Sequence, residues 1–261
     1  YLMPGFVDAH VHIESSMLLP AVFADTAIRH GTLGAVTDPH EIANVAGIDG
    51  VRSMMECCAN SDFVLGIGAP SCVPSISFES CRQVIGPAEI AELMAEPDVT
   101  HLSEVMNVPG VLGGDKELMA KIRCAIDAGK PIDGHAPELS GHDLAAYLAA
   151  GISTDHECVE YSEALEKVKA GMIVMIRGGS AAKLNTSLLG LLNRFSGKCM
   201  FCSDDKHPDD LLKGHINSLA AEAYRHGVPL TSVVRAACVN PVHHYKLPLG
   251  LLREGDRADF I

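Results

Sequence analysis

The chain has 261 residues, of which 48% are hydrophobic and 20% charged, and its formal net charge is −13. A chain this acidic would be repelled by a phosphate backbone, and it offers few aromatic side chains (5%, with no Trp) for stacking on bases, so we expect no nucleic-acid partner. No apolar run reaches the roughly 18 residues of a membrane-spanning helix, so we expect no membrane insertion.

Cysteine usage and the two ends of the chain bear on its compartment and extent. Nine cysteines are scattered along the sequence, mostly among apolar residues, and no basic segment followed by an apolar one resembles a secretory signal. This pattern predicts reduced thiols in a cytoplasmic protein. The sequence begins with Tyr1 and stops within what reads as the start of a strand, residues 253–261. We therefore expect one domain, residues 1–261, excised from a longer chain.

Apolar segments typical of buried strands alternate with amphipathic segments typical of helices. The expected strands are residues 5–14, 32–40, 62–70, 99–107, 131–137, 151–157, 172–179 and 199–205. The expected helices are residues 18–31, 47–61, 87–96, 115–130, 140–151 and 161–171, and residues 239–250 read as the end of a helix leading out of the barrel. Eight alternating strands predict an α/β fold with a parallel sheet, and eight strands close a (β/α)8 TIM barrel of about 250 residues.

Side chains that can bind metals or transfer protons stand at the ends of most of these strands. An open sheet would gather them at one switch point, whereas a barrel gathers them in a ring at its C-terminal face. Here they come from at least six strands, which favours the closed barrel. They are His10, His12, Asp38, His40, Glu104, His135, His156, Asp204 and Asp205.

The first strand carries two of these residues in the segment PGFVDAHVHIESS, residues 4–16. Side chains alternate along a strand, so His10 and His12 point to the same face. Two buried imidazoles are costly in a core but suit a metal site, particularly where further imidazoles and carboxylates converge from other strands. The joint pattern predicts a site for one or two divalent ions at the barrel mouth.

The order of these residues resembles that of the amidohydrolase superfamily: His-x-His on the first strand, a carboxylate on the fourth, His on the fifth and sixth, and Asp on the eighth. Within the superfamily, the segments PGFVDAHVHIESSM, TDPHEIANV, SEVMNVPGV, DGHAP, STDHE and CSDDKHPDDL resemble bacterial adenine deaminases. The resemblance extends from Pro4 to the C-terminus. It implies hydrolytic deamination of adenine to hypoxanthine and ammonia by a metal-activated hydroxide.

The resemblance also implies the ligand set. It assigns His10, His12 and Asp204 to one ion, His135 and His156 to a second, and Glu104 to the bridge between them. Many relatives have a carbamylated Lys on the fourth strand where this chain has Glu104. The implied metal is manganese or iron, with zinc possible, and relatives carry a flanking β-sandwich. We also expect a homo-oligomer, namely a dimer.

Deamination needs a carboxylate that can carry a proton between the attacking water and the leaving amine. Asp204 is our first choice for this role, and Glu104 is a candidate for delivering a proton to N1 of the purine. Asp205 follows Asp204 on a strand and should face the other way, which makes it the fallback.

Four further polar residues have two open interpretations each. Asp38, His40 and Glu41 follow the second strand, where they could contact substrate or hold an accessory metal. Alternatively, Asp38 caps a turn before Pro39 and Glu41 begins a helix. Glu14 could touch substrate or cap the helix that follows it.

Two rival functions share this pattern. A cyclic amidohydrolase or an N-acyl deacetylase would use the same metals, and only residues of the substrate pocket would distinguish it. A non-catalytic barrel serving as a scaffold would be marked by lost ligands, and no expected ligand is missing from this sequence.

Overall fold

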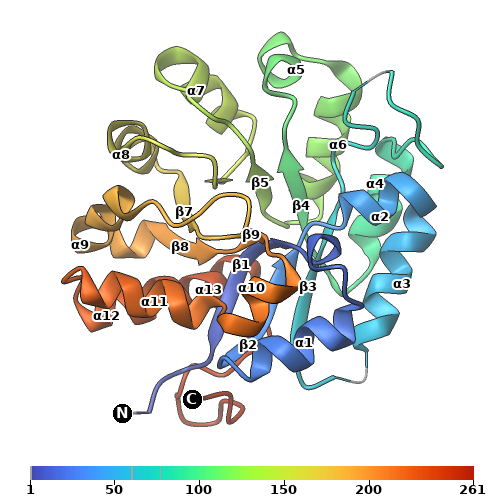
Figure 1. Ribbon diagram of the computed structural model, residues 1–261. Coiled ribbons are helices and arrows are strands. Elements are labelled where there is room, and N and C mark those ends of the chain that lie inside the picture. Colours follow the sequence, from blue (N-terminus) through green and yellow to red (C-terminus); the bar gives the residue numbers. More distant parts are fainter. Residues whose placement is uncertain (1, 60, 77) are drawn as a thin grey trace.

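The computed structural model describes residues 2–59, 61–76 and 78–261, and its strands alternate with helices (Figure 1). All eight predicted strands are present, and the last continues beyond Ser203 as a ninth short strand. They are β1 (Phe6–His12), β2 (Thr32–Thr37), β3 (Val64–Ala69), β4 (Val99–Val105), β5 (Ile132–Gly134), β6 (Thr154–Asp155), β7 (Ile173–Arg177), β8 (Cys199–Cys202) and β9 (Asp204–Asp205).

The strands form a curled parallel sheet. Six of them pair in the order β5-β4-β3-β2-β1-β9, and three pair in the order β6-β7-β8. One residue separates β8 from β9, which joins the two groups on one side. On the other side, the N–H of Ser153 donates to the carbonyl of Ile132 at 2.9 Å, between β6 and β5. The result is the TIM-barrel-like α/β fold that the alternation of strands and helices predicts.

The six predicted helices are also present. They are α1 (Pro20–Ile28), α3 (Ile48–Cys58), α4 (Pro87–Ala95), α6 (Lys116–Asp127), α7 (Gly141–Ala149) and α8 (Tyr161–Lys169). Their buried residues follow helical spacing: in α6, Leu118, Ile122 and Ala125 lie on the buried face. The same helix begins where the side chain of Asp115 accepts a hydrogen bond from the N–H of Leu118 at 2.8 Å.

Further helices occupy the remaining segments, in which the sequence reasoning proposed only a helix beginning at Glu41, as one of two interpretations, and the end of a helix within residues 239–250. Short ones follow strands or connect them: η1 (Ile13–Ser16), α2 (His40–Ala46), α5 (Val108–Gly113), η2 (Thr186–Leu191), α9 (Leu192–Phe195) and η3 (Ser196–Lys198). After β9 the chain forms α10 (Pro208–Lys213), α11 (Ile216–Arg225), α12 (Leu230–Val234), a π-helical turn (Arg235–Val239) and α13 (Asn240–Tyr245).

Apolar residues fill both the inside of the curled sheet and the layer between sheet and helices. Inside, Val7 of β1, Val36 of β2 and Met200 of β8 pack together. Tyr245 and Leu247 pack against the same cluster. The segment after α13 therefore covers the interior of the sheet, and the prediction that it leads away from the barrel is wrong.

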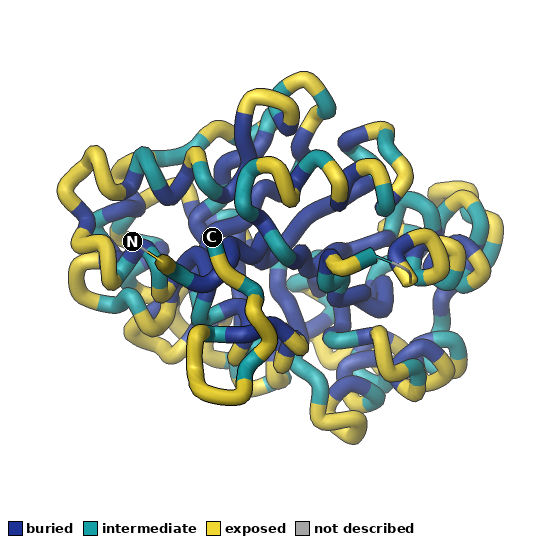
Figure 2. The backbone as a smooth tube through the Cα atoms, turned by 90° about the horizontal axis from the view of Figure 1, so that it is seen from below, coloured by how far each residue is buried: buried dark blue, intermediate teal, exposed yellow. Residues whose placement is uncertain are grey.

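The two ends of the chain lie side by side (Figure 2). The N–H of Met3 donates to the carbonyl of Ile261 at 3.1 Å, and the N–H of Ile261 donates to the carbonyl of Met3 at 2.9 Å. Pro4 and Phe260 form an antiparallel bridge. This pairing agrees with the strand-like character predicted for the last residues.

Two further sequence expectations can be compared with the structure. All nine cysteines are free, and Cys58, Cys158, Cys199, Cys202 and Cys238 are buried. Across the described residues, none of the helices combines the length and the apolar character that crossing a membrane requires.

Candidate metal centre

The six predicted metal ligands meet at the C-terminal ends of the strands, where catalytic groups of TIM-barrel enzymes gather. His10, His12 and Glu104 lie near the ends of their strands, His135 and His156 directly follow theirs, and Asp204 begins the short strand β9. Five of them line a cavity of about 190 Å³ together with residues from neighbouring loops, and the sixth, His10, is fully buried behind it. Its lining residues are His12, His40, Glu41, Glu104, His135, His156, Glu157, Arg177, Asp204 and Asp205.

The two histidines of β1 point to the same face, as the strand alternation predicts. Their Nε2 atoms are 3.2 Å apart, and both rings are almost completely buried. Asp204 Oδ1 lies 3.5 Å from His10 Nε2 and 3.2 Å from His12 Nε2. The neighbouring Asp205 instead accepts a hydrogen bond from the hydroxyl of Ser15, so the two aspartates face different partners.

Glu104 is the centre of the imidazole cluster. The Nδ1 of His135 and Glu104 Oε2 are 2.7 Å apart, and the Nε2 of His156 lies 3.3 Å from the same oxygen. The other carboxylate oxygen, Oε1, lies 3.5 Å from His12 Nε2. Glu104 therefore reaches histidines of three different strand ends, which is the position a bridging carboxylate needs.

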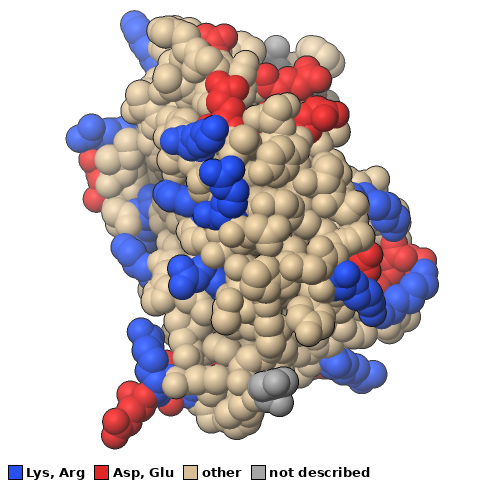
Figure 3. All heavy atoms as spheres, turned by 90° about the vertical axis from the view of Figure 1, so that its left-hand side faces the viewer, with Lys and Arg blue, Asp and Glu red and all other residues tan. Residues whose placement is uncertain are grey.

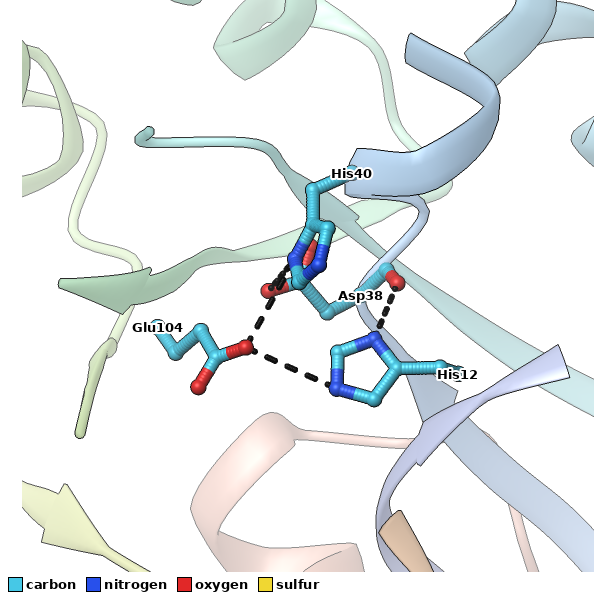
Figure 4. A group of neighbouring side chains, drawn as sticks. All are labelled: His12, Asp38, His40 and Glu104. Carbon is cyan, nitrogen blue, oxygen red and sulfur yellow. Dashed lines mark hydrogen bonds and ion pairs between the residues drawn. The ribbon is translucent and has the colours of Figure 1, made fainter. Parts of the chain in front are cut away.

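The loop after β2 also enters this cluster. His40 Nδ1 lies 3.5 Å from Glu104 Oε1 and 3.3 Å from Asp38 Oδ2 (Figure 4). Asp38 is buried, and its backbone carbonyl lies 3.1 Å from His12 Nδ1. Glu41 stands in the first turn of α2, with its Oε1 3.4 Å from His12 Nδ1. Glu41 thus begins a helix as expected, whereas Asp38 contacts His40.

Glu14 does not cap the helix that follows it. Its Oε1 instead accepts a hydrogen bond from the N–H of Ile42, in the first turn of α2, at 3.2 Å. Burial and the nearby charge of Glu41 raise the pKa of Glu14 to about 7.

Potential ligand atoms form overlapping groups, each compact enough to surround one ion. One group consists of His10, His156 and Asp204, and a second consists of Glu104, His135 and His156. A third consists of His12, Asp38, His40 and Glu104. The rings of His10 and His156 are stacked with centroids 4.1 Å apart. This grouping joins His156 to His10, a pairing that the resemblance does not imply.

The electrostatics of the cluster favour bound positive charge. Burial would raise the pKa of Glu104, but hydrogen bonds from His135 and His156 hold it well below its usual range. Burial would lower the pKa of His40, but the charge and hydrogen bond of Asp38 raise it to about 9. The carboxylates therefore draw protons onto the imidazoles, and a divalent ion can replace those protons.

The donor set fits a divalent metal in a second respect. Several buried side-chain atoms here have no hydrogen-bond partner among the residues that the structure describes, among them His10 Nδ1, His156 Nδ1 and Asp38 Oδ1. Buried polar atoms without partners are rare in folded proteins and often mark a functional site. Imidazoles combined with several carboxylates suit first-row divalent ions.

Two residues of the cavity were not singled out by the sequence reasoning. Arg177, the last residue of β7, donates from Nη1 to Asp204 Oδ2 at 2.7 Å and also to Glu157. Burial would lower the pKa of Arg177, but the charges of Asp204 and Glu157 raise it. Arg177 and Glu157 both stand at strand ends. Their position at the end of a predicted strand was the sequence signal that could have identified them. Arg177 orients one oxygen of Asp204 while the other faces His10 and His12.

A buried lysine fixes the two loops that carry His135 and His156. Lys167 of α8 is fully buried and donates to Asp155 Oδ2 at 2.9 Å, to the carbonyl of Ala136 at 2.6 Å and to Glu163 Oε1 at 2.6 Å. Asp155 Oδ1 in turn accepts from the N–H of Ala136 at 2.8 Å. The ammonium therefore ties the end of β5 to the end of β6.

Replacing Lys167 by methionine is expected to lower the free energy of unfolding by about 3–5 kcal/mol, because it leaves the Asp155 carboxylate buried and unpaired. Urea denaturation measures this loss. Lys169→Met is the matched control, since Lys169 is exposed on the same helix and should change stability by no more than about 0.5 kcal/mol. Equal effects of the two substitutions would contradict the structural role of Lys167.

Comparison with known proteins agrees with the geometry of the strand ends. The model of the amidohydrolase family matches residues 1–261. The chain belongs to the amidohydrolase family. Adenine deaminase from Salinibacter ruber is 53% identical over 261 residues, which are 100% of this chain and 48% of that protein. Adenine deaminase from Methanosarcina barkeri is 49% identical over 262 residues, 100% of this chain and 48% of that protein. The chain spans about half the length of the curated relatives it matches.

Two solved structures share the fold at low identity. N-acetyl-D-glucosamine-6-phosphate deacetylase from Mycobacterium smegmatis matches 100% of this chain and 81% of its own, with a TM-score of 0.71 and 18% identity. β-Aspartyl dipeptidase from Fervidobacterium islandicum AW-1 matches 100% of this chain and 77% of its own, with a TM-score of 0.69 and 18% identity. At this identity the similarity concerns the fold alone.

Proposed function

We propose that this amidohydrolase chain deaminates adenine by hydrolysis, giving hypoxanthine and ammonia. The observation that carries the proposal is the convergence of His10, His12, His135 and His156 on the two carboxylates of Glu104 and Asp204. The curated relatives at about half identity over the whole chain, which are named adenine deaminases, support the choice of adenine.

The proposed ligands of one or two divalent ions are the six residues at the strand ends. In this proposal His10, His12 and Asp204 hold one ion, His135 and His156 hold the second, and Glu104 lies between them. Asp38 and His40 are accessory ligands or substrate contacts, as are Glu14 and Glu41. A bound ion supplies Lewis acidity and lowers the pKa of water from 15.7 to about 7. The carboxylate-rich donor set favours manganese or iron, with zinc possible.

The proposed proton carriers are the two carboxylates. Asp204 faces the histidines through one oxygen and Arg177 through the other, so its carboxylate is fixed in orientation. Such a group can take a proton from the attacking water and pass it to the leaving nitrogen. Glu104 is the candidate for protonating N1 of the purine.

An adjoining cavity offers room for the substrate. It measures about 310 Å³ and shares His40 and Glu41 with the candidate metal centre. Val45, Cys72 and Val73 contribute apolar wall, which suits the faces of a flat purine. A larger cavity of about 360 Å³ lies beside Phe63 and Leu247, but none of the clustered histidines lines it. The chemistry of the side chains, rather than size, therefore favours the cavity beside His40.

The wider setting is also part of the proposal. Residues 1–261 form a single barrel domain of a longer protein that carries a flanking β-sandwich, forms a homodimer and works in the cytoplasm.

Ammonia release from a panel of compounds tests the function. Metal-stripped protein to which manganese is returned should release ammonia from adenine faster than from other aminopurines, and should show no deacetylase or cyclic amidohydrolase activity. Preferred cleavage of an N-acetyl sugar or a cyclic amide would favour the rival enzymes. No turnover of any compound at full metal content would favour a scaffold.

A further inference from the structure

A further cavity, separate from those described above, lies near the ends of β7 and β8, next to the helices that follow β9. It measures about 340 Å³ and shares no lining residue with the candidate metal centre. Its walls come from the loop after β7 and from α10 and α11. The lining residues are Gly178, Gly179, Lys183, Leu184, Lys206, Asp210, Lys213, Gly214, Ser218, Leu219, Glu222 and Arg225.

Lys206 is the unusual residue of this cavity. Its exposed fraction is only 8%, yet its ammonium makes no hydrogen bond or ion pair with any residue that the structure describes. Burial lowers the pKa of Lys206, and Asp8 and Asp210 act on it only as more distant charges. The ammonium nitrogen itself is not fully enclosed, so it faces the cavity, where only water or a bound anion can solvate its charge.

The nearby carboxylates are committed to other partners. Asp8 Oδ1 accepts a hydrogen bond from the N–H of Ser203 at 2.9 Å, and Asp8 Oδ2 lies 2.8 Å from His215 Nε2. Asp210 is held by Lys183 at 2.8 Å and by Lys213 at 3.0 Å. Neither carboxylate is therefore available to neutralise Lys206.

Positive charge exceeds negative charge among the lining residues. The lining residues include four cations, Lys183, Lys206, Lys213 and Arg225, and two carboxylates, Asp210 and Glu222. Asp209, outside the lining, also pairs with Lys213 at 3.2 Å. This local excess occurs in a chain whose acidic residues outnumber Lys and Arg by 33 to 20. In Figure 3, basic side chains are spread over this side of the molecule, with acidic ones beside them at the top and at the right-hand edge. Local positive potential of this kind attracts anions.

Gly178 and Gly179 contribute backbone to the cavity wall. A Cβ at Gly179 would lie 2.2 Å from the carbonyl oxygen of Ser203, and one at Gly178 would lie 2.2 Å from Leu219 Cδ2, so the close packing of this wall requires glycine. The hydroxyl of Ser218, which also lines the cavity, adds a neutral hydrogen-bond donor.

We propose that this cavity, the Lys206 cleft, binds a small dianionic oxyanion, namely phosphate or the phosphate group of a phosphomonoester. Lys206 supplies the unpaired charge that faces the cavity, Lys183 and Lys213 add charge at the rim although both also contact Asp210, and Ser218 donates a hydrogen bond. A tetrahedral dianion can accept from all of them at once, whereas a carboxylate has too few oxygens and too little charge.

The proposal is tested by isothermal titration calorimetry, in which inorganic phosphate is added to the full-length, metal-loaded protein. Lys206→Met should weaken binding at least 10-fold, and Lys206→Arg should retain it. Lys183→Met, at a side chain that is 70% exposed, should weaken it to a smaller extent without risk to folding. Lys116→Met is the control for loss of one exposed positive charge.

Two outcomes would overturn the proposal. Equal affinity in the parent, Lys206→Met and Lys183→Met would mean that phosphate binds elsewhere, for example at the metals. No binding to the parent would mean that Lys206 is merely hydrated. Titration with glycerol 3-phosphate distinguishes the two sources of the same chemistry: tighter binding than inorganic phosphate identifies a phosphomonoester, and weaker binding identifies the free ion.

Discussion

Replacing Asp204 by asparagine is expected to lower adenine turnover at least about 100-fold, the low end for a general acid–base group. Ammonia leaves only after its nitrogen is protonated, whereas chloride leaves without a proton. The same variant should therefore lose clearly less turnover of 6-chloropurine. Asparagine keeps an oxygen that can face His10 and His12, but it cannot carry a proton.

The ratio of the two rates, measured at verified metal content, separates proton transfer from ligand binding. Asp127→Asn is the matched control, because its carboxylate is exposed beside Arg123 and lines no part of the candidate metal centre. Equal losses for adenine and 6-chloropurine in Asp204→Asn would mean that Asp204 acts only as a ligand or in activating water. Glu104 would then be the leading candidate for protonating the leaving amine.

Strand ends were the most predictable part of the molecule. The alternation of apolar and amphipathic segments is a local property of the sequence, and it located all eight expected strands and six helices. The common orientation of His10 and His12 follows from strand geometry and is confirmed by their 3.2 Å separation. Parallel strands then bring their C-terminal ends together, which gathers Glu104, His135 and His156 without further information.

Features that depend on contacts between distant segments were not predictable in this way. Helix α11 is different, because its buried residues Ile216, Leu219 and Ala223 recur at helical spacing. The sequence therefore contained the signal for this helix, although the prediction did not include it. In contrast, Arg177 is a lone basic residue in its segment, and its role depends on Glu157 and Asp204, 20 and 27 residues away. No local pattern reveals such a pairing. The stacking of His10 on His156 likewise depends on how the curled sheet closes.

Replacing Glu104 by glutamine is expected to have an effect as large as that of Asp204→Asn, but of a different kind. Glu104 lies between histidines of three strand ends and His40 of α2, so its two negative oxygens hold the whole cluster together. Glutamine has nearly the same shape but turns one acceptor into a donor that faces imidazole nitrogens. Adenine turnover should fall roughly 10²- to 10⁴-fold.

Metal content distinguishes this defect from the loss of a proton carrier. If Glu104 bridges two ions, Glu104→Gln should bind fewer ions per chain than the parent at equal manganese, whereas Asp127→Asn should bind the same number. Both adenine and 6-chloropurine turnover should then fall together, since each reaction needs the metal-activated water. Glu104→Asp keeps the charge on a shorter side chain and should recover part of the metal content. Full metal content with a loss confined to adenine would instead assign Glu104 to proton delivery at N1, and full turnover of both substrates would exclude it from the site.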